Sequence, residues 1–183
     1  FELGVGGVTE PKAEWTAAAQ RHMKAAIAAR QAKLALGAVE LSERDADEFA
    51  EPLSLHAAVA QSVAFHHLGL ANFNLPTKAG QLDWSFGEAL QGLGQKTGAR
   101  YGLFVWVRDY YASAERKAMM VGLALLGVVV PGGAQLAYAS LVDLQTGRVV
   151  WFNKLVRGHG DLREAKPAEE SVEALLANFP TVR

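Results

Sequence analysis

Residues 99–111, ARYGLFVWVRDYY, constrain the fold more strongly than any other stretch of this 183-residue chain. Alternate side chains of an extended segment point to opposite faces, so Leu103 and Val105 share one face while Phe104 and Trp106 share the other. Because both faces are apolar, the segment predicts a strand in the middle of a sheet that is covered on both sides. A covered central strand favours an α/β fold, with helices packed against the sheet.

A β-hairpin is predicted by LVDLQTGRVVWF, residues 141–152. Two apolar runs are separated by three residues that end in glycine, which is typical of a hairpin loop closing on a residue with positive φ. Gly147 adopts that conformation at little cost, and Asp143 is expected to accept hydrogen bonds from the loop amides. Asp143, Thr146 and Gly147 are therefore predicted to form a structural turn rather than a catalytic site.

The remaining segments predict one α/β domain over residues 1–183, with a mixed sheet flanked by helices in a three-layer-like arrangement. The length and the 50% hydrophobic content suit a single core. Thr9, Ser54 and the Ser85–Glu88 pair are the predicted helix caps, and Asp83 is a rival cap for the helix at Ser85. The predicted helices cover residues 10–31, 54–67, 85–98, 113–126 and 167–178, and further strands are expected at 34–41, 134–144 and 148–156. The inward face of the second helix is predicted to hold Leu55, Val59, Ser62, Val63 and His66.

Composition and motif context exclude several function classes. The formal net charge is −1 and the 18 basic residues are scattered, so nucleic acid is not expected as a partner. The absence of cysteine excludes disulfides, zinc–thiolate sites and a cysteine nucleophile. The stretch GQKTG stands at a predicted helix end and before a strand, which is the reverse of a phosphate-loop context. With no Gly-x-Ser-x-Gly elbow either, we expect no cofactor and no enzymatic activity.

The histidines do not predict a metal site. His66 and His67 are adjacent, so on a helix they point about 100° apart, unlike the i, i+4 pair of zinc-binding helices. The loop RGHGDLR offers an anion site formed by Arg157, His159 and Arg163, but an ordinary surface loop is the favoured interpretation.

The end of the central strand is the main candidate for a small-molecule or enzymatic site. Arg108, Asp109, Tyr110 and Tyr111 lie there, and strand ends in α/β sheets are common binding places. The interpretation that we prefer is an ion pair at the sheet edge beside two packing aromatic side chains.

Residues 118–130, AMMVGLALLGVVV, are strongly apolar and too short to span a membrane as a helix. Three interpretations compete: a buried helix or strand, an exposed patch for a partner or a second copy, and contact with a lipid surface. We expect a helix from about residue 113 to 126, mostly packed on the sheet with one edge available for contact. The candidate contact residues here are Arg116, Lys117, Met119, Met120 and Leu123.

Taken in order, these motifs resemble a known group of proteins. A helix, the GARYGLFVWV strand, a variable insertion, the LVDLQTG–VVWF hairpin and a final helix are similar to bacterial envelope lipoproteins. Those proteins share the α/β domain of the curli-secretion lipoprotein CsgG and of the TolB amino-terminal domain. EPKAEWT near the start and VRDYYASAERKA after the central strand resemble uncharacterised lipoproteins of this group. Their lipid-bearing cysteine and usual first strand are missing, so we expect a trimmed amino terminus.

The resemblance implies a non-enzymatic periplasmic protein that acts in envelope assembly, secretion or its regulation. It implies anchoring to the outer membrane in the full-length form, and hence membrane proximity through the missing lipid anchor. The expected partner is another envelope protein or a second copy of the chain. Residues 118–130 lack the alternation of a transmembrane hairpin, so the membrane pore of the curli channel is not expected here.

Overall fold

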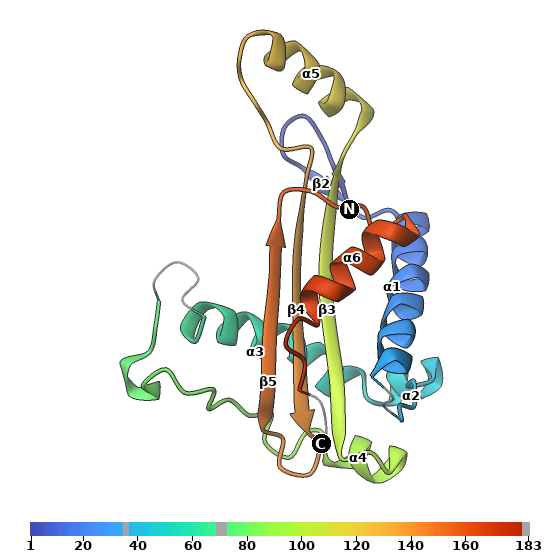
Figure 1. Ribbon diagram of the computed structural model, residues 1–183, viewed down its shortest axis with the longest axis vertical. Helices are drawn as coiled ribbons and strands as arrows, with labels where there is room; N and C mark the ends of the chain where they lie inside the picture. Colours follow the sequence, from blue (N-terminus) through green and yellow to red (C-terminus); the bar gives the residue numbers. More distant parts are fainter. Residues whose placement is uncertain (35–36, 69–72, 181–183) are drawn as a thin grey trace. The chain divides into compact units, whose positions relative to one another are not determined.

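The computed structural model describes residues 1–34, 37–68 and 73–180, and it has an α/β fold with a five-stranded sheet (Figure 1). The strands are β1 (Glu2–Leu3), β2 (Thr9–Glu10), β3 (Tyr101–Ala112), β4 (Gly133–Asp143) and β5 (Val149–Arg157). The helices are α1 (Ala13–Lys33), α2 (Glu43–Glu48), α3 (Ala50–His66), the 3-10 helix η2 (Pro76–Lys78), α4 (Gln91–Thr97), α5 (Ala114–Leu125) and α6 (Ala165–Leu175).

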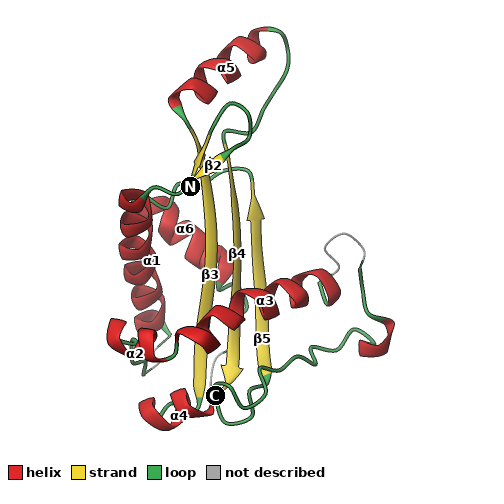
Figure 2. Ribbon diagram, turned by 180° about the vertical axis from the view of Figure 1, so that it is seen from behind, coloured by secondary structure: helices red, strands yellow, loops and turns green. Residues whose placement is uncertain are grey.

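The sheet is mixed, and β3 is its central strand, as predicted. The strand order is β2-β1-β3-β4-β5. β1 runs parallel to β3, with Glu2 opposite Tyr111, and antiparallel to β2, with Leu3 opposite Thr9. β4 and β5 are the two arms of the predicted hairpin, and their arrows point in opposite directions in Figure 2.

The chain divides into two compact units. The first contains residues 1–36, 107–137 and 155–177, and the second contains residues 37–106, 138–154 and 178–183. The three long strands β3, β4 and β5 contribute residues to both units, whereas each helix belongs to one unit.

In the first unit, α1 and α6 pack against each other (Figure 1). Met23 and Ala26 are the buried side chains of α1, and α6 buries Ala168, Ser171, Val172 and Leu175. The predicted start of the first helix was wrong, because Thr9 and Glu10 pair with β1 as a short strand. Helix α1 therefore begins at Ala13, and Lys12 is its N-cap.

In the second unit, α3 buries His56, Ala60, Val63 and Ala64, so the predicted inward face was displaced by about one position. Leu55 is 41% exposed. Burial of His56 has a physical basis, because its Nε2 lies 2.9 Å from the Ser140 Oγ and its ring stacks with the rings of Phe86 and Phe104. An apolar cluster accompanies them and consists of Phe86, Leu90, Leu93, Phe104, Val142, Leu144 and Val149.

Two predicted caps of the second unit were also wrong. Helix α3 begins at Ala50, and the Ser54 hydroxyl instead donates to the Ala50 carbonyl within the helix at 2.7 Å. Ser85 forms a bridge with Arg148 and accepts a hydrogen bond from the Gly87 amide, so α4 begins later, at Gln91. Residues 37–41 of the strand predicted at 34–41 have no regular structure, and positions 35–36 lie outside the described residues.

The predicted turn between β4 and β5 is confirmed. The Asp143 Oδ1 accepts hydrogen bonds from the amides of Gln145 and Thr146, both at 3.0 Å. These bonds lower the pKa of Asp143, and the bond from the Thr146 amide has the largest effect. Gly147 has a φ of 69°, and a Cβ at this position would lie 1.9 Å from the Gly87 carbonyl oxygen. Gly147 is therefore required both by its backbone conformation and by the close approach of Gly87.

Gly147→Ala should lower the free energy of unfolding by more than about 2 kcal/mol, because the left-handed conformation and the clash with Gly87 both oppose a methyl group. Gly98→Ala is the matched control. Gly98 has a nearly equal φ of 67°, but a Cβ there would meet nothing within 4 Å. The control should lose only about 1 kcal/mol in urea denaturation. Equal losses in the two variants would contradict the proposed close contact.

Burial lowers the pKa of His56 to about 4, so the folded protein keeps this ring neutral. The unfolded chain protonates near pH 6.5, and stability is therefore lost as the pH falls from about 6.5 towards 4. The substitution His56→Gln removes the titration and retains polar atoms that can face Ser140. Between pH 7 and 4.5, the wild type should lose on the order of 2 kcal/mol more than the variant. Parallel losses in urea denaturation at the two pH values would argue against a neutral buried His56.

Candidate functional site

The candidates at the end of β3 all lie in the first unit, where their side chains contact other parts of that unit. The Arg108 guanidinium lies over the Phe1 ring at 5.4 Å, and the Tyr110 ring lies 5.6 Å from the same ring. The Asp109 carboxylate accepts hydrogen bonds from the Leu162 amide at 2.9 Å and from the Gln135 side chain at 3.4 Å. These contacts give the strand end a structural role.

Asp109 belongs to a polar network that the sequence analysis did not find. The buried Gln135 on β4 accepts a hydrogen bond from the Arg157 Nε at 2.9 Å, and its Oε1 lies 3.0 Å from the Ser171 hydroxyl. Arg157 also donates to Ser171. No local signal marks the pairing of these residues, because Asp109, Gln135, Arg157 and Ser171 come from four separate elements. Burial raises the pKa of Asp109, and the hydrogen bond from Leu162 opposes that shift.

The possible anion site consists of Arg157, His159 and Arg163. The structure does not bring these three side chains together as hydrogen-bond donors that are available to an anion. Arg157 is directed into the network with Gln135. Arg163 forms a two-pronged ion pair with Asp161, at 2.7 and 2.6 Å, whereas His159 is exposed. Because the two guanidinium groups already have separate partners, this loop offers an anion little unsatisfied donor capacity.

The Tyr111 ring interacts with two cations and connects the core of the first unit to α5. The Arg163 guanidinium lies 3.9 Å from the ring centroid, and the Lys117 ammonium of α5 lies 4.3 Å from it. Arg163 also lies 4.3 Å from the ring of Trp15 on α1. Cation–π contacts of this kind stabilise by about 0.5–2 kcal/mol each, so the first turn of α5 is held in place.

Two further bonds fix the start of α5. The Ser113 hydroxyl caps the helix by accepting from the Arg116 amide at 3.2 Å, and the Arg116 guanidinium donates to the Gly4 carbonyl at 3.1 Å. The predicted helix is thereby confirmed, since α5 spans Ala114–Leu125. Its contact with the β1–β2 loop and its N-cap make the direction of the helix well defined.

The expectation that this helix is mostly packed on the sheet was wrong. None of the residues of α5, all of which are described, is buried. The helix starts where β3 ends and points away from α1 and α6, as both views show (Figures 1 and 2). A half-buried stripe of Arg116, Met119, Met120 and Leu123 faces the protein, and the opposite stripe has no cover.

We call residues 118–130 the apolar arm. Its most exposed large side chains are Val121 (65%), Leu125 (85%), Leu126 (78%) and Val129 (90%). Val128 is also exposed, and apolar side chains that are exposed together in one segment commonly mark a contact surface. Burying side chains of this size stabilises by about 1.5–3 kcal/mol each, so the arm is the strongest candidate for a binding surface.

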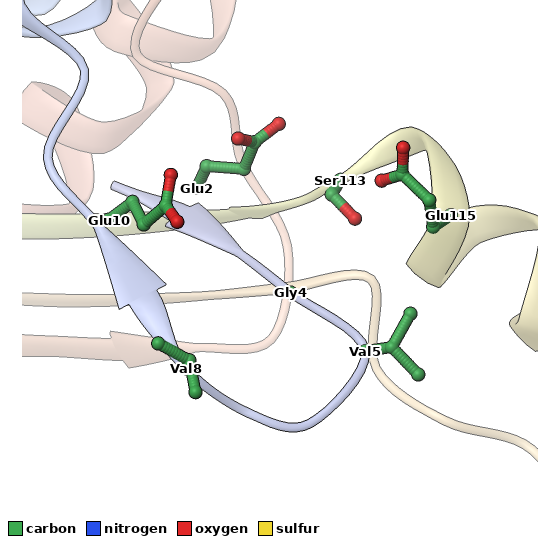
Figure 3. Close-up of a pocket in the computed structure, with 7 residues that line it drawn as sticks. All are labelled: Glu2, Gly4, Val5, Val8, Glu10, Ser113 and Glu115. Carbon is green, nitrogen blue, oxygen red and sulfur yellow. The ribbon is translucent and has the colours of Figure 1, made fainter.

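A pocket of about 310 Å³ lies at the base of the arm, between the β1–β2 loop and the start of α5 (Figure 3). Its lining consists of Glu2, Gly4, Val5, Val8, Glu10, Ser113 and Glu115. Lys12 neutralises part of this acidity, since its ammonium lies 2.8 Å from the Glu2 carboxylate and 3.3 Å from that of Glu10. The pocket therefore combines an acidic rim with two valines.

Neither a metal site nor a membrane-spanning helix is found within residues 1–34, 37–68 and 73–180. No cluster of three or more His, Asp or Glu side chains there is arranged to hold a metal ion. Among the same residues, no helix is both long and apolar enough to cross a membrane.

No family model, curated protein or solved structure matches this chain. The resemblance to envelope lipoproteins therefore stays a hypothesis.

Asp109 should impose an unusual pH dependence. Because burial raises its pKa in the folded state, Asp109 contributes stability that is present at low pH and lost as the pH rises through the folded pKa. The wild type should therefore gain stability relative to Asp109→Asn when the pH falls from 7 to 4. Asp143→Asn should show the opposite trend, since the pKa of Asp143 is lowered. Trends of the same sign in urea denaturation would contradict the assigned environment of Asp109.

Proposed function

We propose that the protein is a non-enzymatic contact module of the bacterial cell envelope, which acts by binding protein through the apolar arm. The observation that supports this proposal is the uncovered stripe of α5, where Val121 and Leu125 are exposed although the neighbouring helices of the same unit bury their apolar faces. Large exposed apolar patches on soluble domains commonly mark interaction surfaces.

The base of the arm is organised for binding. Ser113 caps the helix, Arg116 is bonded to the Gly4 carbonyl, and Lys117 lies over Tyr111. These contacts orient the helix before any partner arrives. Less conformational freedom is then lost on association, and more of the apolar contact energy contributes to affinity.

The alternative, a small-molecule or enzymatic site at the end of β3, has weaker support. Asp109 already accepts two hydrogen bonds, and Tyr111 already carries two cations on its ring. A ligand there would have to displace these internal partners, whereas a partner of the arm displaces only water.

The envelope location follows from the resemblance to lipoproteins. In this proposal the full-length protein is periplasmic and anchored to the outer membrane by lipid, and the arm contributes to envelope assembly, secretion or its regulation. Cell fractionation of the full-length protein tests the location, and recovery in the cytoplasm would contradict it.

A photo-crosslinking residue at position 125 tests binding through the arm in intact cells. We expect covalent adducts from Leu125, which is exposed at the end of α5, and none from the control position Glu173, which is exposed on α6 of the same unit. Mass spectrometry would show whether the captured protein is a second copy or another envelope protein. An absence of protein adducts at position 125 would contradict the proposed function.

A further inference from the structure

The three methionines of the chain have different environments, and all three lie in the first unit. Met23 is only 8% exposed on α1, whereas Met119 and Met120 are half-buried on α5. Because no residue of α5 is buried, solvent reaches the thioethers of this helix. Methionine side chains that solvent reaches are oxidised to the sulfoxide, so Met119 and Met120 are more accessible to an oxidant than Met23.

Met120 makes a contact that connects α5 to the chain that follows it. Residues 127–132, which we call the return segment, lead from the tip of α5 back to β4 (Figure 1). A Cβ built at Gly132 would lie 3.2 Å from the methyl carbon of Met120. Among the described residues, and apart from the chain neighbours of Gly132, no other atom lies within 4 Å of that position. The Met120 methyl group therefore occupies the space that a side chain at position 132 would fill.

The backbone under Met120 is held by the end of β3. The Gly132 carbonyl accepts a hydrogen bond from the Ala112 amide at 2.9 Å. At the next position, a Cβ on Gly133 would lie 2.5 Å from the Tyr110 carbonyl oxygen, so the two backbones are in close contact. Because the return segment is fixed here, a change in the size or polarity of the Met120 side chain has to be accommodated by movement of α5.

We propose that Met120 is a reversible oxidation site that controls the position of α5. The oxidant is hydrogen peroxide: its O–O bond breaks, one oxygen atom forms a bond to the thioether sulfur, and the other leaves as water. The sulfur loses two electrons in this step. Methionine sulfoxide reductases reverse it, since a dithiol supplies two electrons and the oxygen leaves as water. The inference goes beyond the proposed function, because it concerns the conformation of the arm and holds whatever the arm binds.

The added oxygen makes the contact with Gly132 unfavourable. Oxidation converts a flexible apolar side chain into a polar one, and a polar group that is removed from water without a hydrogen bond is destabilising. The sulfoxide is therefore better solvated when α5 moves away from the return segment. The first turn of the helix stays attached through Arg116 and Lys117, so oxidation loosens α5 from Met120 onward and leaves its base in place.

Hydrogen exchange of the purified chain, measured by mass spectrometry, tests this effect. Hydrogen peroxide should oxidise Met119 and Met120 before Met23. The amides of residues 120–125 should then exchange at least about tenfold faster than in the untreated chain, whereas the exchange of the α6 amides should not change. Oxidation of Met23 first, or unchanged exchange in α5 after oxidation of Met120, would overturn the inference.

Two leucine variants identify the methionine that is responsible. Leucine has nearly the volume of methionine and no sulfur, so Met119→Leu and Met120→Leu should both fold. The Met119→Leu chain retains Met120, and peroxide should still accelerate exchange in its α5. The Met120→Leu chain should exchange at the same rate before and after peroxide treatment. Equal acceleration in the two variants would overturn the role of Met120.

Reduction provides the last test. Incubation of the oxidised chain with the two methionine sulfoxide reductases, one for each sulfoxide epimer, and a dithiol should restore slow exchange in α5. Fast exchange that persists after the mass has returned to that of the untreated chain would overturn a reversible switch. These measurements need no partner. A chain whose α5 responds to peroxide but gives no protein adducts at position 125 in cells would contradict the proposed function and leave this inference intact.

Discussion

Strand β4 is buried along most of its length, and the polar side chains on it must therefore find partners inside the protein. Gln135, Ser140 and Asp143 are all buried. Gln135 is bonded to Arg157 and to Ser171 of α6, Ser140 lies beside His56, and Asp143 accepts the turn amides. An unpaired buried polar group costs about 1–3 kcal/mol, so these pairings select the α6, α3 and hairpin arrangements that satisfy them.

The parts of the fold that were predictable are those in which local chemistry decides the structure. The apolar faces of β3 required a central strand whatever covered it. The turn at Asp143 and Gly147 depends on a side chain within hydrogen-bonding reach of the next amides and on one residue with positive φ. Gly98 ends α4 for the same backbone reason. In each case the interacting atoms are only a few positions apart in the sequence.

The parts that were not predictable depend on residues far apart in the sequence. Ser171 lies 36 positions from Gln135, and His56 lies 84 positions from Ser140, so no local pattern indicates either pair. The exposure of the arm was missed for a related reason. Apolar spacing shows that a helix has an apolar face, but it does not show whether that face meets the same chain or another molecule.

The first turn of α5 is held by specific contacts, whereas Leu125 at its last turn is exposed. A helix whose apolar surface meets no partner would be expected to pack against its own protein, because exposing leucine and valine side chains to water is unfavourable. Here specific contacts oppose that collapse: the Arg116 guanidinium is held by the Gly4 carbonyl, and Lys117 and Arg163 both contact the Tyr111 ring. The hydrogen bonds and cation–π contacts at the base thus hold the apolar stripe away from its own core. The proposed association relies on this arrangement, because a surface that is already oriented loses less conformational freedom when a partner binds.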